Sequence, residues 1–161
     1  MGINYTPGTY TTGTLMTAAI WATEVQNPFT GIQAAWTSYT PVWTSNGTAP
    51  AIGNGSLVGS YLQIGKTILW RHRILAGSTT TFGSGAYFIS LPITPANPQQ
   101  IGTGLLRSGG SAYGFFASYI GDAGGVRYHS STSPAIVWGA ATPSTFANTN
   151  DLFGSGTYEI P

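Results

Sequence analysis

The sequence predicts a mainly β protein: a jelly-roll-like antiparallel β-sandwich preceded by an extended N-terminal arm and one short α-helix. Two observations favour this fold class. From about residue 37 onward, short runs of alternating apolar and polar residues are separated by turns rich in glycine and asparagine. Before residue 37, a single segment spaces its apolar residues at helical intervals.

Residues 1–13 are polar, rich in glycine and threonine, and predict an extended arm. We expect the helix to begin after Thr14, which can cap its N-terminus, and to stop at Asn27-Pro28. An isolated helix of about 12 residues is marginal in water, so its apolar face should dock on a neighbouring surface. That face and the tryptophan beside it comprise Leu15, Ala18, Ala19, Trp21, Ala22 and Val25.

Eight short segments have the alternation and the flanking turns that are typical of β-strands. They are residues 39–45, 57–64, 67–76, 86–91, 112–120, 126–130, 135–138 and 157–160. Seven or eight short strands with such turns favour a sandwich or a barrel over other β architectures.

The strand predicted at residues 67–76 has large side chains on both faces. One face carries Ile68, Trp70, His72 and Ile74, and the other carries Leu69, Arg71, Arg73 and Leu75. Several other strands share this property, which indicates that one face packs the core and the other meets another subunit. The candidate subunit-interface residues are Leu69, Arg71, Arg73, Leu75, Phe88 and Phe116. The two arginines either bind a carboxylate of a partner subunit or remain solvated.

Charged residues are few, 6% of the 161 residues, whereas an ordinary soluble domain has about 25%. The 42% hydrophobic and 13% aromatic residues supply enough apolar surface for folding, which argues against disorder. No run approaches the roughly 20 apolar residues of a membrane-spanning helix. The net charge of +1, without a basic run, argues against nucleic-acid binding.

Groups that could carry catalysis are equally scarce. Two histidines, His72 and His129, can be paired on paper with Asp122 or Asp151, but no nucleophile motif accompanies them. Asp151 is interpreted as a turn residue before the last strand. Without cysteines or a cluster of acids near a histidine, neither a metal site nor a cofactor is predicted. We therefore predict no enzymatic activity, and keep a cell-wall hydrolase only as a third hypothesis.

Several blocks of this sequence together resemble virion structural proteins of tailed phages that infect actinobacteria. The matching blocks are residues 18–25 (AAIWATEV), 31–36 (GIQAAW), 39–44 (YTPVWT), 59–66 (GSYLQIGK), 90–92 (SLP) and 155–159 (SGTYE). Residues 93–150 resemble that family less. The resemblance implies a jelly-roll β-sandwich, usually homotrimeric, that forms a tail-tip protein, a fibre knob, or a capsid decoration or head fibre.

These observations lead to one functional hypothesis with an alternative. In the first, residues 1–36 attach the protein to the virion or brace a homotrimer, and residues 37–161 form a β-sandwich displayed on the virion surface. The partners are then further copies of the chain and other virion proteins, such as major capsid or tail proteins, and host lysis releases the particle. The alternative is a receptor-binding tail module for a host surface glycan, with an aromatic platform of Tyr113, Tyr119, Tyr128 and Trp138.

Overall fold

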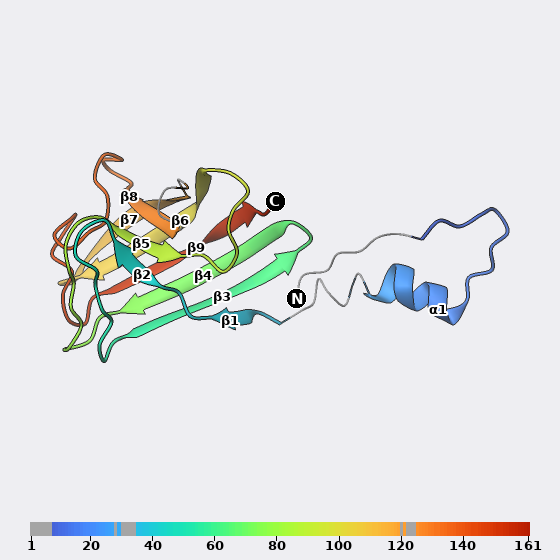
Figure 1. Cartoon of the computed structure of the whole chain (residues 1–161), viewed down its shortest axis with the longest axis horizontal. Coiled ribbons are helices and arrows are strands. Elements are labelled where there is room, and N and C mark those ends of the chain that lie inside the picture. The colour runs from blue at the N-terminus through green and yellow to red at the C-terminus, as the bar shows by residue number, and fades with distance from the viewer. Residues whose placement is uncertain (1–7, 28, 30–34, 120, 122–124) are drawn as a thin grey trace.

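The structure, a computed structural model, describes residues 8–27, 29, 35–119, 121 and 125–161. Its described strands form one antiparallel sheet in the order β1-β3-β4-β9-β6-β7-β8-β5-β2 (Figure 1). The strands are β1 (Thr37–Tyr39), β2 (Trp43–Ser45), β3 (Ser56–Ile64), β4 (Thr67–Leu75), β5 (Tyr87–Ser90), β6 (Gln99–Ser108), β7 (Ser111–Tyr119), β8 (Gly125–Ser130) and β9 (Asp151–Glu159). The mainly β, sandwich-like prediction is confirmed, with the two layers made by one curled sheet.

The two edge strands explain the curl. β1 and β2 stand at opposite ends of the strand order, yet only residues 40–42 separate them in the chain. Four residue steps span at most about 14 Å, so the two ends of the sheet must approach each other. Pro41 lies in this connection, where it lacks a backbone N–H for a ladder. One strand predicted at residues 39–45 is therefore two strands that pair with different partners.

Three other strand predictions need correction. β6 was not predicted, because Gly102 and Gly104 interrupt its apolar pattern. β9 begins at Asp151, six residues before the predicted start. Residues 135–138 do not form a strand, and Val137 makes only an isolated bridge to His129.

The helix begins later than predicted. α1 (Ala18–Trp21) continues as a π-helical turn, η1 (Ala22–Gln26). Its N-cap is Thr17, whose hydroxyl accepts the Ile20 N–H at 3.2 Å. The predicted cap, Thr14, instead donates its hydroxyl to the Thr11 carbonyl at 2.8 Å. Figure 1 draws this helix outside the curled sheet.

The inner face of the sheet encloses an aromatic core. Alternation in β4 buries Ile68, Trp70, His72 and Ile74, the four residues that the sequence predicted to share one face. Trp138 lies in the centre of the aromatic cluster, stacked on Trp43 at 6.1 Å between ring centroids. The buried core residues with large side chains are Trp43, Ile68, Trp70, Ile74, Tyr87, Ile89, Ile101, Leu106, Phe115, Tyr119, Val126, Tyr128, Trp138, Phe146, Leu152 and Tyr158.

Glycines make room for one buried ring. Gly104 on β6 pairs with Gly154 on β9, and Gly154 pairs with His72 on β4. The Tyr128 side chain fills the space above both glycines, where an added Cβ would collide with it. Its Oη lies 2.6 Å from His72 Nε2. Neither Gly104 nor Gly154 has a positive φ angle. Glycine is therefore needed at these positions for close packing and not for an unusual backbone conformation.

We predict that Gly154→Ala destabilises the protein, because the new methyl group must displace the Tyr128 hydroxyl or the His72 ring. Overpacking of this kind costs about 1–3 kcal/mol. Urea unfolding followed by tryptophan fluorescence measures the loss. The control is Gly114→Ala on β7, whose nearest neighbour is the Ser131 hydroxyl at 3.1 Å. Equal stability of the two variants would contradict this explanation of the glycine pair.

Candidate functional site

An open groove of about 650 Å³ lies on the outer face of the sheet of the β domain. It lies over β3, β4, β9 and β6, which are adjacent in the sheet. Its lining residues are Trp36, Ser38, Val58, Gly59, Ser60, Arg71, His72, Arg73, Thr103, Gly104, Leu105, Phe153, Gly154 and Ser155. A groove of this size is comparable with the sites at which proteins bind small ligands.

Strand register assembles the groove from two rows of side chains. One row crosses the sheet as Ser60, Arg71, Ser155 and Thr103, and the adjacent row as Val58, Arg73, Phe153 and Leu105. These residues alternate with the buried ones on the same strands, so they point to the outer face. The first row therefore carries hydroxyl groups and the Arg71 guanidinium, and the second row is apolar except for Arg73.

Arg71 is held in position at the centre of the hydroxyl row. Its Nε donates to Ser60 Oγ at 2.8 Å, and its guanidinium lies 4.4 Å from the ring centroid of Trp36. Among the described residues, Arg71 has no ion-pair partner. Its terminal N–H groups remain available to a ligand, because Nε makes the only hydrogen bond of its side chain within the described chain.

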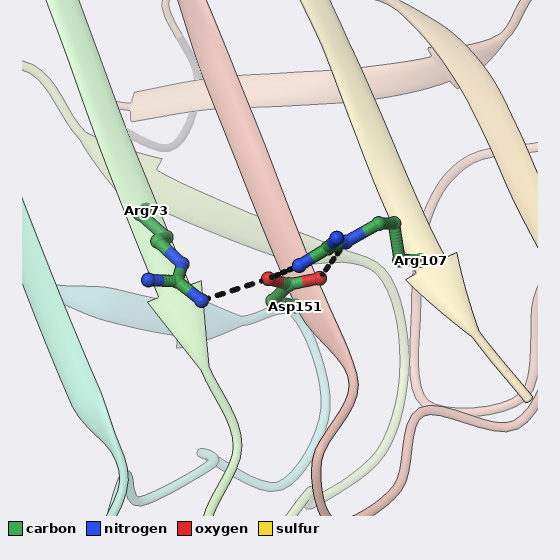
Figure 2. A network of polar contacts seen from close by, with 3 residues as sticks. All are labelled: Arg73, Arg107 and Asp151. Carbon is green, nitrogen blue, oxygen red and sulfur yellow. Dashed lines mark hydrogen bonds and ion pairs between the residues drawn. The ribbon is translucent and has the colours of Figure 1, made fainter. Parts of the chain in front are cut away.

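A second basic group lies along the sheet from Arg71. Asp151 lies between Arg73 of β4 and Arg107 of β6 and accepts hydrogen bonds from both (Figure 2). The distances are 2.9 Å from Arg73 Nη2 to Oδ2, and 2.8 and 2.7 Å from Arg107 Nε and Nη2 to Oδ1 and Oδ2. The Asp151 side chain is only 2% exposed. Asp151 is the first residue of β9, so its prediction as a turn residue is wrong, and Arg107 was not among the predicted site residues.

The Arg107 hydrogen bonds are the main reason why the pKa of Asp151 is lowered, and Arg73 adds to this effect against the opposing effect of burial. The carboxylate thus stays ionised and ties three neighbouring strands together on the outer face. Each arginine also lies near the Phe153 ring, at 5.1 Å for Arg73 and 5.2 Å for Arg107. This arrangement of Arg73, Asp151 and Arg107 is called the arginine clip below.

The predicted interface residues do not form one free surface. Phe88 is buried, with the Arg127 guanidinium 4.6 Å from its ring centroid, so its prediction as an interface side chain is wrong for the isolated chain. Arg73 is bound to Asp151 of its own chain. Leu69 and Leu75 are half-buried, and Phe116 is 38% exposed. Arg71 is exposed and lies in the groove.

The predicted glycan platform is corrected by burial. Tyr119, Tyr128 and Trp138 all belong to the core, and Tyr128 and Trp138 have no exposed surface. Tyr113 is partly buried and packs against the same core. Tyr119, Tyr128 and Trp138 therefore stabilise the fold and offer no stacking surface to a sugar, so the four residues do not form a platform.

The predicted helix face is, by contrast, largely open. Leu15 is 80% exposed and Trp21 is 54% exposed. Ala18 and Ala19 are also exposed, whereas Ala22 and Val25 are half-buried. None of the helical residues is buried.

The arm folds back on the helix through Glu24. The Gly8 N–H donates to Oε1 and Oε2 at 3.1 and 3.2 Å, and the Tyr10 hydroxyl donates to Oε1 at 2.7 Å. The Glu24 carboxylate also raises the pKa of the Tyr10 phenol, mainly through this hydrogen bond. Residues 8–27 thus form a local arm–helix unit.

The candidate catalytic groups are not assembled into a site. His72 points into the core, whereas Asp151 belongs to the outer face of the same sheet. His129 Nδ1 contacts the Pro134 carbonyl oxygen at 3.0 Å, and Asp122 lies outside the described residues. Within the described ranges, no group of three or more histidines and acids lies close enough to hold a metal ion.

Comparisons with protein-family models, with curated proteins and with solved structures gave no match. The resemblance to phage virion proteins therefore stays a prediction from the sequence blocks. In the part of the chain that the structure describes, no helix is long and apolar enough to cross a membrane.

Burial of His72 makes the fold sensitive to mild acid. Desolvation lowers the pKa of its imidazole to about 3, and its Nδ1 has no hydrogen-bond partner among the described residues. The unfolded chain binds this proton near pH 6.5 and the folded chain does not. Stability should therefore fall as the pH drops from 6.5 toward 3, by about 2 kcal/mol between pH 7 and pH 5.

Urea unfolding at pH 7 and at pH 5 tests this prediction. His72→Gln should lose most of the difference between the two pH values, whatever its absolute stability. His129→Gln, which changes a half-buried histidine at the surface, should keep it. If the His72→Gln protein retained the full pH dependence, the proton would belong to another group.

The arginine clip predicts a second effect, at lower pH. Asp151→Asn removes the charge that holds Arg73 and Arg107, with an expected loss of about 1–3 kcal/mol at neutral pH. Because the folded pKa of Asp151 is lowered, its contribution is complete above about pH 4 and is lost as the pH falls further. Chemical unfolding is measured between pH 2 and pH 7 at intervals of about one pH unit. The native chain should show this loss of stability at low pH, and the Asp151→Asn chain should not. Glu159→Gln, an exposed carboxylate on the same strand, is the matched control.

Proposed function

We propose that this protein is a non-enzymatic structural component of a phage particle that assembles with copies of itself, as a homotrimer, and with other virion proteins. The arm–helix unit is the assembly element, and the β domain is displayed on the virion surface. The observation that carries this proposal is the exposure of the apolar helix face beside a β domain that already has a complete core.

The energetics of the helix support an assembly role. Leu15, Met16 and Trp21 each expose more than half of their surface, and Phe29 follows at 63%. Full burial of one such side chain contributes about 1.5–3 kcal/mol. A helix this short is not stable alone in water, and the arm contacts it through polar bonds to Glu24 while its large apolar neighbours stay exposed. Contact with neighbouring chains would supply the missing burial.

The scarcity of charge supports the same proposal. Only 9 of 161 residues are charged, since the chain has 5 basic and 4 acidic residues. Subunit contacts in obligate assemblies are depleted of charge and rich in aromatic residues. The sequence blocks that resemble actinobacteriophage virion proteins point in the same direction, because none of them carries a catalytic motif.

The native chain should sediment at three times its mass of 16.8 kDa. The double variant Leu15→Ser, Trp21→Ser should dissociate, because it removes two large exposed apolar side chains of the arm–helix unit. Sedimentation equilibrium measures both masses. Val42→Ser is the control, since Val42 is 59% exposed but belongs to the β domain. A native chain that remained a well-folded monomer at high concentration would contradict the proposal.

A further inference from the structure

The geometry points to a ligand site in the outer groove: we propose that it binds an anionic saccharide, with Arg71 contacting the acidic group and Trp36 packing against the sugar ring. This site is independent of the assembly role proposed above. It also differs from the aromatic platform predicted from sequence, three of whose four residues are in the core.

The charge of the groove selects an anion. Arg71 and Arg73 line the groove, and beside it Arg107 and Asp151 complete the arginine clip, which gives these four residues a net charge of +2. Glu159, the other carboxylate of β9, lies farther along the strand and does not line the groove. Arg71, Arg73 and Arg107 are three of the five basic residues of the chain. Because Asp151 accepts from two guanidiniums and is nearly inaccessible, it does not neutralise Arg71. An acidic ligand is therefore attracted to the Arg71 end of the groove.

Arg71 is prepared for that contact before any ligand arrives. Ser60 and Trp36 fix its Nε edge and one face, so little side-chain entropy remains to be lost on binding. The free terminal N–H groups form a planar fork that matches carboxylate, sulfate or phosphate oxygens. Lysine at this position would lack both the fork and the stacking on the indole.

The remaining lining suits a sugar ring. Trp36 is 39% exposed and forms an apolar wall at one side of the groove. Sugars present C–H groups on their faces that pack on aromatic rings, and hydroxyl groups on their edges. The side chains of Ser38, Thr103 and Ser155 line the groove without a hydrogen-bond partner among the described residues. They can donate to or accept from sugar hydroxyl groups.

An acidic peptide would match the charge of the groove, but the sheet face below the groove does not suit a peptide backbone. A peptide that binds to a sheet by strand addition pairs its backbone with a free strand edge. The groove lies on the face of the sheet, and β4 and β9 below it are paired on both sides. Their backbone N–H and C=O groups are already used in the ladder, so a peptide finds no main-chain partner there.

A glycan array tests the proposal with the full chain. It presents neutral oligosaccharides beside uronic-acid, sialylated, sulfated and phosphorylated ones, and calorimetry of the best hit follows. Binding should require the acidic group, and the array arms identify which acid is preferred. Arg71→Gln should weaken calorimetric binding about tenfold or more, as loss of a charge-assisted contact does. Trp36→Ala should weaken the same binding without removing the preference for acidic sugars.

Lys66→Gln is the matched control, because it removes one positive charge from an exposed turn outside the groove and should leave affinity unchanged. Absence of binding to every acidic glycan, equal binding of neutral ones, or equal binding of hexaglutamate would overturn the proposal. The sedimentation mass of Arg71→Gln is measured in parallel. A changed mass would assign Arg71 to a subunit contact instead and overturn the ligand site, whereas failure of glycan binding alone leaves the assembly proposal standing.

Discussion

The pairing of two nearly consecutive strands with opposite ends of one sheet is the constraint on which the fold depends. β1 pairs with β3, and β2 pairs with β5, although residues 40–42 alone connect β1 to β2. So short a connection brings the sheet ends together and gives the sheet an inner and an outer face (Figure 1). The inner face closes around aromatic rings. The outer face is left to carry the groove and the arginine clip.

The curl explains why glycine occurs in the middle of long strands. Where β4, β9 and β6 lie side by side, the inner face has the row His72, Gly154 and Gly104. The Tyr128 ring from β8 occupies the space that side chains would fill, and its hydroxyl satisfies one nitrogen of a histidine that burial keeps neutral. Burial likewise raises the pKa of the Tyr128 phenol, so both groups stay uncharged in the core. Packing and acid sensitivity therefore have the same structural origin.

On the outer face, the few charged side chains lie close together, where they join strands or remain available to a ligand. Asp151 connects β4 and β6 through two arginines (Figure 2). Arg71, two residues from Arg73, keeps its terminal donors available. The apolar side chains of the arm–helix unit come from a different segment of the chain. Because the two surfaces share no residue, substitutions can separate assembly from ligand binding.

The sequence by itself determined the class of fold, the single helical segment, most strands and the faces of β4, because these features follow from local periodicity. Only the tertiary structure decided which strands neighbour each other, and the site depends on that choice. Asp151 binds Arg73 and Arg107, which are 78 and 44 residues away in the sequence. A local sequence pattern cannot predict contacts over such separations. The same reason hid β6, because Gly104 is explained only by the Tyr128 ring that packs on it. It is also why the sequence predicted Tyr128 and Trp138 as surface rings. Periodicity reports which residues of a strand share a face, whereas burial of that face depends on the partners that the curl brings over it.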